Sequence, residues 1–489
     1  MTGGGRSEGA GKNEGGRLGC VIVRPTSLAT ATLKKTSWLV IPLLTLALSP
    51  ARGAEVTRVV SALDDDNRFD LNLTATWMHE VKSAFIKREL QSALGTELIK
   101  DLKYGFTRDV INFRADFGIL WDVGLHVEVP LVIADQSTLD FDQSENNCVF
   151  PGGATRPTCV NAENSTILRD GILPSDGSSW GINSSNHGGG GAGDYSGQST
   201  SVFKSPKRSG FGYLGVGISW AAFNQLRDDT KPTWTLNFDA LLDVFQDKRF
   251  DAANPVGNTA VGPGYHQFVW STYVSKRFRY FDPYFGAWYN LPVRTNGSVF
   301  QKYSDNQTSV NPQQRAGVVI GVEQIAWENP VANQRVTIEA RVRAEQHFFG
   351  RSHSELWEPL SGSSACASDM AACRPGIDGP MQPYPGVTDT EAYGSFGGDF
   401  GLNVQVGRYI RFRGLFGLTS DMPHFITAGG AGKDRDGDHR INSTADANND
   451  GILDEGSPIY RESIDLPGRR FKVESTRLWT LFLQGSLMF

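Results

Sequence analysis

The chain lacks the features that mark helical membrane proteins, nucleic-acid-binding proteins and the common hydrolases. Mean hydropathy is −0.30 and hydrophobic residues make up 39% of the 489 residues, so the composition excludes a helical membrane protein. The formal net charge of −6 argues against a nucleic-acid surface. There is no Gly-x-Ser-x-Gly, no His-Glu-x-x-His and no phosphate loop, and the eight histidines are scattered. No residue is therefore nominated for catalysis.

Cysteine is also scarce, with five residues in the chain. Cys20 precedes the export signal described below, and the others form two close pairs, Cys148 with Cys159 and Cys366 with Cys373. Both pairs lie in segments rich in Gly, Ser and Pro. Paired cysteines at short spacing in an exported chain predict two local disulfides. Free thiols and a metal site are the alternatives, but no histidine stands near them at zinc-finger spacing.

An export signal is predicted at 34–54. It combines the basic pair Lys34-Lys35, an apolar run at 37–49 and small residues at 50–54, with cleavage expected after Gly53 or Ala54. The apolar run is too short for a spanning helix. Residues 1–33 form a Gly-rich extension without apolar periodicity. We expect translation to begin within or after this extension, from a codon other than Met, because no internal Met is available there.

After the signal, apolar and polar residues alternate in about twelve segments of the length of barrel strands. Alternation with period two places one kind of side chain on each face of a strand. The segments are 69–77, 111–119, 125–133, 214–220, 234–244, 268–274, 284–288, 316–322, 336–344, 396–406, 412–418 and 473–489.

The connections between these segments alternate between short and long. Short connections are expected at 121–124, 224–231, 279–282, 328–334 and 407–411, and long ones at 80–107, 135–210, 246–264, 295–313, 350–389 and 427–471. Within the first of these long connections, residues 80–102 have Ile86, Leu90, Leu94 and Leu98 at four-residue spacing, which fits a short amphipathic helix, but an extension of the neighbouring strands fits it equally. A soluble sandwich has no reason to keep this alternation of lengths.

The C-terminal strand has one wholly apolar face, formed by every second residue from Trp479 to Phe489. It resembles the closing strand of bacterial outer-membrane β-barrels, whose terminal aromatic residue is read by the barrel-assembly machinery. The resemblance implies an all-β fold for 55–489: one closed antiparallel transmembrane barrel of about twelve strands, with short periplasmic turns and long outer loops near 135–210, 350–389 and 427–471. It also implies location in the outer membrane, in contact with lipid and lipopolysaccharide. For this strand alone, a terminal strand of a soluble sandwich is the alternative.

Charged residues of both signs fall on the face of the strands opposite the apolar one. They are expected to line the lumen, either as a selectivity constriction with a transverse field or as pairs that satisfy one another in a filled interior. The set is Arg114, Asp116, Glu128, Asp239, Asp243, Glu323, Glu339, Arg341, Arg343, Glu345, Asp399, Arg411, Arg413 and Arg477.

The last long loop carries a repeated pattern of acidic residues. Alternate Asp and Asn residues supply the hard oxygens that Ca²⁺ prefers. The pattern is not an EF-hand, because neither copy has Glu at its twelfth position. Over about 22 residues it resembles the tandem calcium repeats of thrombospondin type 3, which implies a structural Ca²⁺ in this loop; a solvated acidic turn is the alternative. The expected ligands are Asp434, Asp436, Asp438 and Asn442 in the first copy and Asp446, Asn448, Asp450 and Asp454 in the second.

The sequence therefore predicts an outer-membrane barrel without enzymatic activity, acting as a channel or uptake porin for small solutes. Charged lumen strands favour this function. A non-transporting surface barrel, acting as an adhesin, a receptor or a component of an envelope machine, is the alternative that the long loops favour. A membrane-embedded hydrolase is the third hypothesis, for which no residue can be named.

Overall fold

The computed structural model describes residues 53–60, 70–92, 95–120, 122–142, 160, 165–169, 201–250, 258–362, 374–376, 379–382, 385–435, 437–441 and 455–489. All of them belong to one unit of the chain, 48–489. The helices within these ranges are short: η1 (Glu55–Thr57), α1 (Thr166–Arg169), α2 (Trp357–Gly362) and α3 (Glu462–Asp465). None of the helices described is long and apolar enough to cross a membrane.

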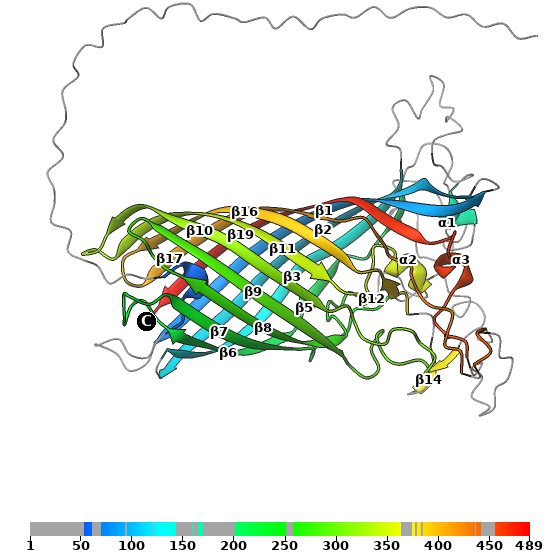
Figure 1. The fold of residues 1–489 in the computed structure, drawn as a ribbon, viewed down its shortest axis with the longest axis horizontal. Helices are drawn as coiled ribbons and strands as arrows, with labels where there is room; N and C mark the ends of the chain where they lie inside the picture. Colours follow the sequence, from blue (N-terminus) through cyan, green and yellow to red (C-terminus); the bar gives the residue numbers. More distant parts are fainter. Residues whose placement is uncertain are drawn as a thin grey trace, which may run out of the picture. The chain divides into compact units, whose positions relative to one another are not determined.

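Twelve antiparallel strands close into a single barrel, as the sequence predicts (Figure 1). Each strand pairs with its neighbour in chain order, because every polypeptide connection leads to an adjacent antiparallel partner. The barrel strands are β1 (Leu71–Ser92), β2 (Gly95–Leu120), β3 (Val123–Phe141), β6 (Leu214–Phe223), β7 (Thr233–Leu242), β8 (Tyr265–Ser275), β9 (Phe281–Arg294), β10 (Arg315–Asn329), β11 (Gln334–His347), β16 (Tyr393–Val406), β17 (Ile410–Asp421) and β19 (Phe471–Met488).

The first and last strands form the closing pair of the barrel. Leu73 lies opposite Leu487 and Trp77 opposite Leu483. The backbones of Leu71 and Phe489 exchange two hydrogen bonds, of 3.1 and 2.8 Å. The C-terminal residue therefore completes the ring, and neither strand is left with an unpaired edge.

Large apolar side chains cover the outer surface of the barrel. Phe113, Ile320, Val342 and Phe400 are 50%, 57%, 61% and 61% exposed, and they come from strands β2, β10, β11 and β16. Exposing such a side chain to water costs about 1.5–3 kcal/mol relative to burial, whereas lipid tails solvate it. A closed barrel with this exterior satisfies its backbone within a bilayer, so the chain is an outer-membrane protein.

The five short connections predicted from the sequence lie at the end of the barrel where β1 begins and β19 ends. Asp122, Arg279, Asn333 and Gly407 take positive φ values of 62°, 58°, 51° and 70° in these turns. Tight hairpins require this left-handed region, which Gly, Asn and Asp adopt more readily than other residues. The predicted short connections are confirmed, and short turns identify this end as periplasmic.

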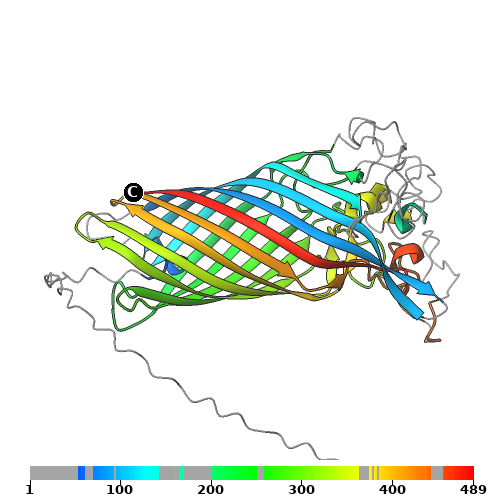
Figure 2. The same cartoon turned by 90° about the horizontal axis from the view of Figure 1, so that it is seen from above.

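The described residues of the segment at 80–107, which are 80–92 and 95–107, form strands and not a loop or a helix. Strands β1 and β2 continue through it as one long hairpin, with Ile86 opposite Leu102, and project past the neighbouring strands (Figure 2). The alternative of continued strands is confirmed and the amphipathic helix is wrong. Burial explains the outcome, because Ala84, Ile86 and Arg88 are buried and the residues between them are not. This is a period of two rather than 3.6.

Parts of the outer loops fold into a cap with its own apolar core. The cap contains α1, α2, α3 and the short strands β4 (Ser201–Lys204), β5 (Arg208–Phe211), β12 (Gly350–Ser352), β15 (Thr388–Thr390) and β18 (His424–Phe425); β13 (Arg374–Gly376) pairs with β14 (Gly379–Gln382) in the same region of the chain. Its buried residues include Ile86, Leu102, Ile167, Phe203, Leu356, Leu360, Ile464 and Phe471. The core therefore joins the β1–β2 hairpin to three different outer loops.

Candidate functional site

Most of the charges expected in the lumen lie on the inner faces of the strands. They alternate with outward-facing apolar residues. On β2, for example, Arg114 and Asp116 point into the barrel, whereas Phe113 points outward and is exposed. The residues on the inner faces are Arg114, Asp116, Glu128, Asp239, Glu323, Glu339, Arg341, Arg343, Glu345, Asp399, Arg411 and Arg413. Asp243 lies just beyond the end of β7. Arg477 is exposed and shares its strand face with Trp479, so it lies outside the lumen.

One cluster of these charges lies on β11, β16 and β17. Arg341 Nε donates to Asp399 Oδ2 at 2.8 Å, and Arg343 Nη2 lies 3.5 Å from Asp399 Oδ1. Arg413 Nη2 lies 2.7 Å from Glu339 Oε2. The Glu339 and Asp399 side chains are 0% and 5% exposed, while those of Arg341 and Arg343 are 20% and 35% exposed. The carboxylates are therefore buried against the wall, and the guanidinium groups face the lumen.

A second cluster lies on β2, β3 and β7. Arg114 is 2.8 Å from Asp116 and 3.9 Å from Glu128, and its side chain is 34% exposed. His126 Nε2 and Asp239 Oδ1 are 2.6 Å apart. Glu128 also accepts hydrogen bonds from Tyr213 and Asn112, both at 3.1 Å. Cross-strand pairing thus occurs in both clusters, but it leaves charged groups accessible from within the barrel.

Glycines on the inner wall let charged side chains lie flat. A Cβ atom at Gly217 would stand 2.3 Å from His126 Nε2, and one at Gly417 would stand 2.1 Å from Asp399 Oδ1. Both distances are far below contact, so only Gly fits beneath these side chains. A side chain that lies across the neighbouring strand does not extend into the middle of the barrel. This arrangement keeps space in the lumen.

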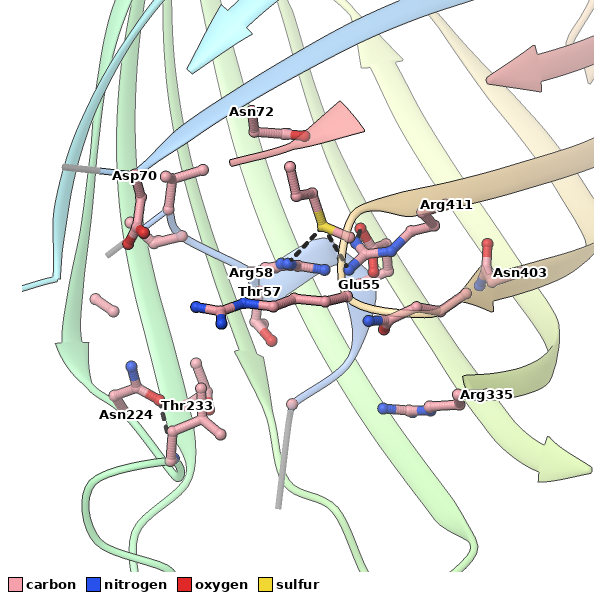
Figure 3. A pocket seen from close by; sticks show the side chains of 18 of the residues that line it. Glu55, Thr57, Arg58, Asp70, Asn72, Asn224, Thr233, Arg335, Asn403 and Arg411 are labelled. Atoms are coloured by element: carbon pink, nitrogen blue, oxygen red, sulfur yellow. Dashed lines mark hydrogen bonds and ion pairs between the residues drawn. The ribbon is translucent and has the colours of Figure 1, made fainter. Parts of the chain in front are cut away.

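The periplasmic mouth holds the segment 53–60, which we call the inner segment (Figure 3). Ala54 and Thr57 are buried. Thr57 Oγ1 and Ser275 Oγ are 2.7 Å apart, and Ala54 N donates to the same Ser275 hydroxyl at 3.1 Å. The inner segment contacts β8 through Ser275, and it contacts β10 and β17 as well. Because these strands lie at different places around the ring, the inner segment lies inside the barrel.

Two further contacts hold the inner segment to other strands of the wall. Glu55 N donates to Glu323 Oε1 on β10 at 2.8 Å, and the Glu55 carboxylate pairs with Arg411 on β17. A cavity of about 420 Å³ remains between the inner segment and the wall. Arg335 and Asn403 line this cavity from one side and Asn224 and Thr233 from the other (Figure 3). The inner segment therefore narrows the mouth with a few polar contacts and does not fill it.

The outer mouth is crossed by the connection between β11 and β16. Glu355 of this connection accepts a hydrogen bond from Lys82 of β1 at 2.8 Å, and Glu358 accepts one from Ser137 of β3 at 3.2 Å. Strand β3 lies directly across the ring from β11, and β1 lies four places along the ring from it. The connection must therefore span the opening to reach them.

Three buried arginines hold the cap together. Arg208 donates to Glu358 Oε1 from Nε at 3.0 Å and from Nη2 at 2.6 Å, and to three backbone carbonyls of the β7–β8 connection. Arg88 donates to backbone carbonyls of Arg469, Thr166 and Ser463. Arg351 donates to those of Gln301 and Val299, both at 3.2 Å. Sequence analysis missed all three, because an isolated Arg in a loop or an extended hairpin looks like an ordinary surface residue.

Burial in the cap also shifts ionisation. Burial, together with the neighbouring cations Lys248, Arg208 and Arg351, holds the pKa of His353 well below its ordinary value, so this histidine is neutral. Burial is the largest single effect on Glu355 and acts against its ionisation, but the ammonium group of Lys82, the nearby His424 and hydrogen bonds to the carboxylate together hold the pKa of Glu355 below its ordinary value. The cap thus contains a neutral histidine beside a charged Lys–Glu pair.

The predicted calcium loop is described only in part. Asp434 accepts backbone hydrogen bonds from Gly437 at 2.7 Å and from His439 at 2.8 Å, and Asp438 accepts one from Arg440 at 2.7 Å. His439 has a φ of 64°, the conformation that Gly would supply at this place in a calcium loop. Asp436, Asn442 and the whole second copy (Asp446, Asn448, Asp450 and Asp454) lie outside the described residues, so the calcium site stays a prediction.

The predicted disulfides are likewise untested. Cys148, Cys159, Cys366 and Cys373 all lie outside the described ranges. Within those ranges, no group of three or more His, Cys, Asp and Glu residues is arranged to hold a metal ion.

No protein-family model and no curated protein sequence matches the chain. The fold is similar to a COG4313 outer membrane channel from Pseudomonas putida F1, with 8% identity, a TM-score of 0.36, and coverage of 85% of this chain and 95% of that one. It is also similar to a FadL homologue from Pseudomonas aeruginosa, with 8% identity, a TM-score of 0.30, and coverage of 86% and 90%.

A third similarity is to the outer membrane protease OmpT from Escherichia coli, with 6% identity, a TM-score of 0.26, and coverage of 86% and 97%. At these identities and scores, the similarities do not decide whether this chain is a channel or a protease. The closed barrel, its apolar exterior and its inner wall are the features of this chain from which a function must be argued.

Proposed function

We propose that the protein is a gated channel for small solutes, whose periplasmic mouth is narrowed by the inner segment in this conformation. The observation that carries the proposal is the inner wall at mid-barrel. Arg114 and Arg343 point inward in a closed barrel, yet their side chains are 34% and 35% exposed. A wall whose charged groups still meet solvent surrounds accessible space. Flat packing of side chains over Gly217 and Gly417 supports the same conclusion.

The inner segment has the properties of a periplasmic gate. Its described polar contacts with the wall are those of Ala54, Glu55, Thr57 and Arg58. Each such contact contributes about 0.5–1.5 kcal/mol, so together they stabilise the closed mouth by a few kcal/mol. That free energy is small enough for a ligand or a partner to offset. A gate that opens on demand needs this balance.

Single-channel recording in planar bilayers tests the proposal. The full-length protein is compared with the double variant Glu55→Gln, Thr57→Ala, which removes the Arg411 pair and the Ser275 hydrogen bond. We expect rare conductance steps from the natural protein and frequent ones from the variant. Glu97→Gln, at an exposed position of the β1–β2 hairpin, makes the same change of charge and should behave like the natural protein. Barrels that are folded by circular dichroism and silent in both forms would overturn the proposal.

A second function, that of a non-transporting surface receptor or adhesin, is favoured by the folded cap. An apolar core and three buried arginines hold the cap, which is more order than a passive loop requires. If this is the main role, binding of host cells or of an envelope partner should persist when the pore is blocked. Loss of binding on blocking the pore would count against it.

We also propose that β19 directs assembly and that the apolar exterior contacts lipid and lipopolysaccharide. The proposal is supported by the pairing of Phe489 with Leu71, which makes the terminal residue part of the closing seam. Deletion of Phe489 should lower the amount of assembled barrel in the outer membrane, measured by heat-dependent gel migration. Equal assembly with and without Phe489 would refute this role.

A further inference from the structure

The two lumen clusters lie on opposite walls of the barrel. Strands β3, β6 and β7 are each six places along the ring from β11, β16 and β17, respectively, in a barrel of twelve strands. Asp239 therefore faces the side of the lumen that carries Arg413, and Glu128 faces the side that carries Arg341. The lumen therefore lies between the two clusters.

Both clusters also lie at a similar depth. Arg114 is opposite Thr74 on β1. On the other side of the seam, Arg413 is opposite Gln484, which is opposite Thr76. Through these strand pairings, Arg114 and Arg413 align with Thr74 and Thr76 of β1, which are only two residues apart. A solute on the axis of the barrel passes both clusters at the same time.

The two walls carry opposite net charge. The wall of β2, β3 and β7, which we call the acidic wall, has three carboxylates (Asp116, Glu128 and Asp239) and one guanidinium (Arg114), leaving His126 aside. The wall of β11, β16 and β17, the basic wall, has three guanidiniums (Arg341, Arg343 and Arg413) and two carboxylates (Glu339 and Asp399).

Exposure strengthens the positive character of the basic wall. The acids of the basic wall are the most deeply buried of the set, so Arg341 and Arg343 present the groups that a solute meets there. On the acidic wall, Arg114 is the most exposed group, at 34%, but it is paired with Asp116 at 2.8 Å. The side chain of Asp239 is 23% exposed, so the wall also presents a carboxylate to the lumen. Neutral residues also face inward between the walls, namely Ser271 and Tyr273 on β8 and Gln484 on β19. The field therefore runs across the lumen rather than along it.

We infer that this lumen selects solutes that carry a carboxylate and a cationic group together, zwitterions the size of an amino acid, over neutral or singly charged molecules of equal size. The carboxylate meets the guanidiniums of Arg341 and Arg343, and the cationic group meets Asp239 and Glu128. A singly charged solute is attracted by one wall and repelled by the other, and a neutral solute gains from neither. The inference rests on the proposed channel function and adds the class of solute.

Swelling of liposomes that contain the full-length protein tests the inference. Alanine, lactamide and lactate have nearly the same shape but are zwitterionic, neutral and anionic. The assay is run with the natural protein and with the gate variant Glu55→Gln, Thr57→Ala, so that a closed mouth does not hide the result. We expect alanine to enter about threefold faster than either analogue, a modest effect of opposed charges in a wet pore.

Single neutralisations on each wall complete the test. Arg343→Gln leaves Asp399 paired with Arg341, and Asp239→Asn leaves His126 a hydrogen-bonding partner, so both variants retain the local packing. Each should bring the rate for alanine close to that for lactamide, while Arg440→Gln on the exposed loop should not. Equal rates for the three solutes, or fastest entry of lactate, overturn the inference and leave the channel intact. Entry of no solute in either form overturns the channel itself.

Discussion

Replacement of Arg208 by Met should open the outer cap without unfolding the barrel. The Arg208 and Glu358 side chains are 1% and 3% exposed and are joined by two hydrogen bonds. Removing the cation leaves Glu358 buried without its partner, which costs about 3–5 kcal/mol. Three carbonyls of the β7–β8 connection lose a donor as well. At about 1.4 kcal/mol per tenfold change, the open population of the cap rises by roughly 100- to 4,000-fold.

Hydrogen exchange measured by mass spectrometry resolves this effect. Peptides that contain α2 should lose most of their protection in Arg208→Met, while peptides from β10 and β11 should exchange as in the natural protein. Lys207→Met changes the adjacent exposed residue and is the matched control, with no change expected. In the double variant Arg208→Met, Glu358→Gln, part of the protection should return, because the stranded charge is gone. An α2 peptide that stays fully protected in Arg208→Met would refute the role given to this ion pair.

Three further predictions concern the outer loops. Asp465 in α3 has a pKa raised to about 6, mainly by burial. Because the pKa of Asp465 is lower in the unfolded chain, the folded state binds an extra proton between about pH 4 and 6, and exchange protection of α3 should fall as pH rises through this window. Asp465→Asn should abolish this trend. Protection independent of pH in the natural protein would contradict the prediction. Calorimetry should detect weak Ca²⁺ binding that is lost when Asp434 and Asp446 are changed to Asn, and binding that survives both changes would place the ion elsewhere. Mass spectrometry of the natural protein should show no alkylation of either cysteine pair before reduction, whereas alkylation without reductant would show free thiols.

Period-two alternation made the barrel predictable from sequence. Lipid-facing residues such as Phe113 and lumen-facing residues such as Arg114 differ strongly in polarity, so both faces of a strand can be recognised from its sequence. The turns followed from the breaks in this pattern, and Asn333 and Gly407 are residues suited to them. The local sequence pattern was therefore sufficient to predict the strands and the short turns.

The cap and the inner segment depend on contacts between residues far apart in the chain. Arg208 finds its partner 150 residues away, and Thr57 finds Ser275 218 residues away. Neither Gly53–Val60 nor the cap segments have a periodicity that reveals such partners. The four-residue spacing of Ile86 to Leu98 suggested a helix because the neighbours that bury Ile86 and Leu102 come from other loops.

Charge placement was predicted better than charge pairing. The inner positions followed from alternation, whereas the division into an acidic and a basic wall depends on the order of strands around the ring. Arg343 and Asp239 come from strands that only the closed barrel sets opposite each other. The closure itself was predicted from the terminal strand, and the arrangement of charges is its consequence.

Locking the inner segment to the wall tests the central claim most directly. Thr57 Oγ1 and Ser275 Oγ are 2.7 Å apart, so the double variant Thr57→Cys, Ser275→Cys places two sulfurs near the disulfide distance of about 2.05 Å. Conductance is recorded in planar bilayers before and after addition of a reductant, with the natural protein treated in the same way to account for its own cysteines. We predict a silent oxidised variant that conducts once it is reduced. The same conductance in both states would show that the inner segment does not close a pore.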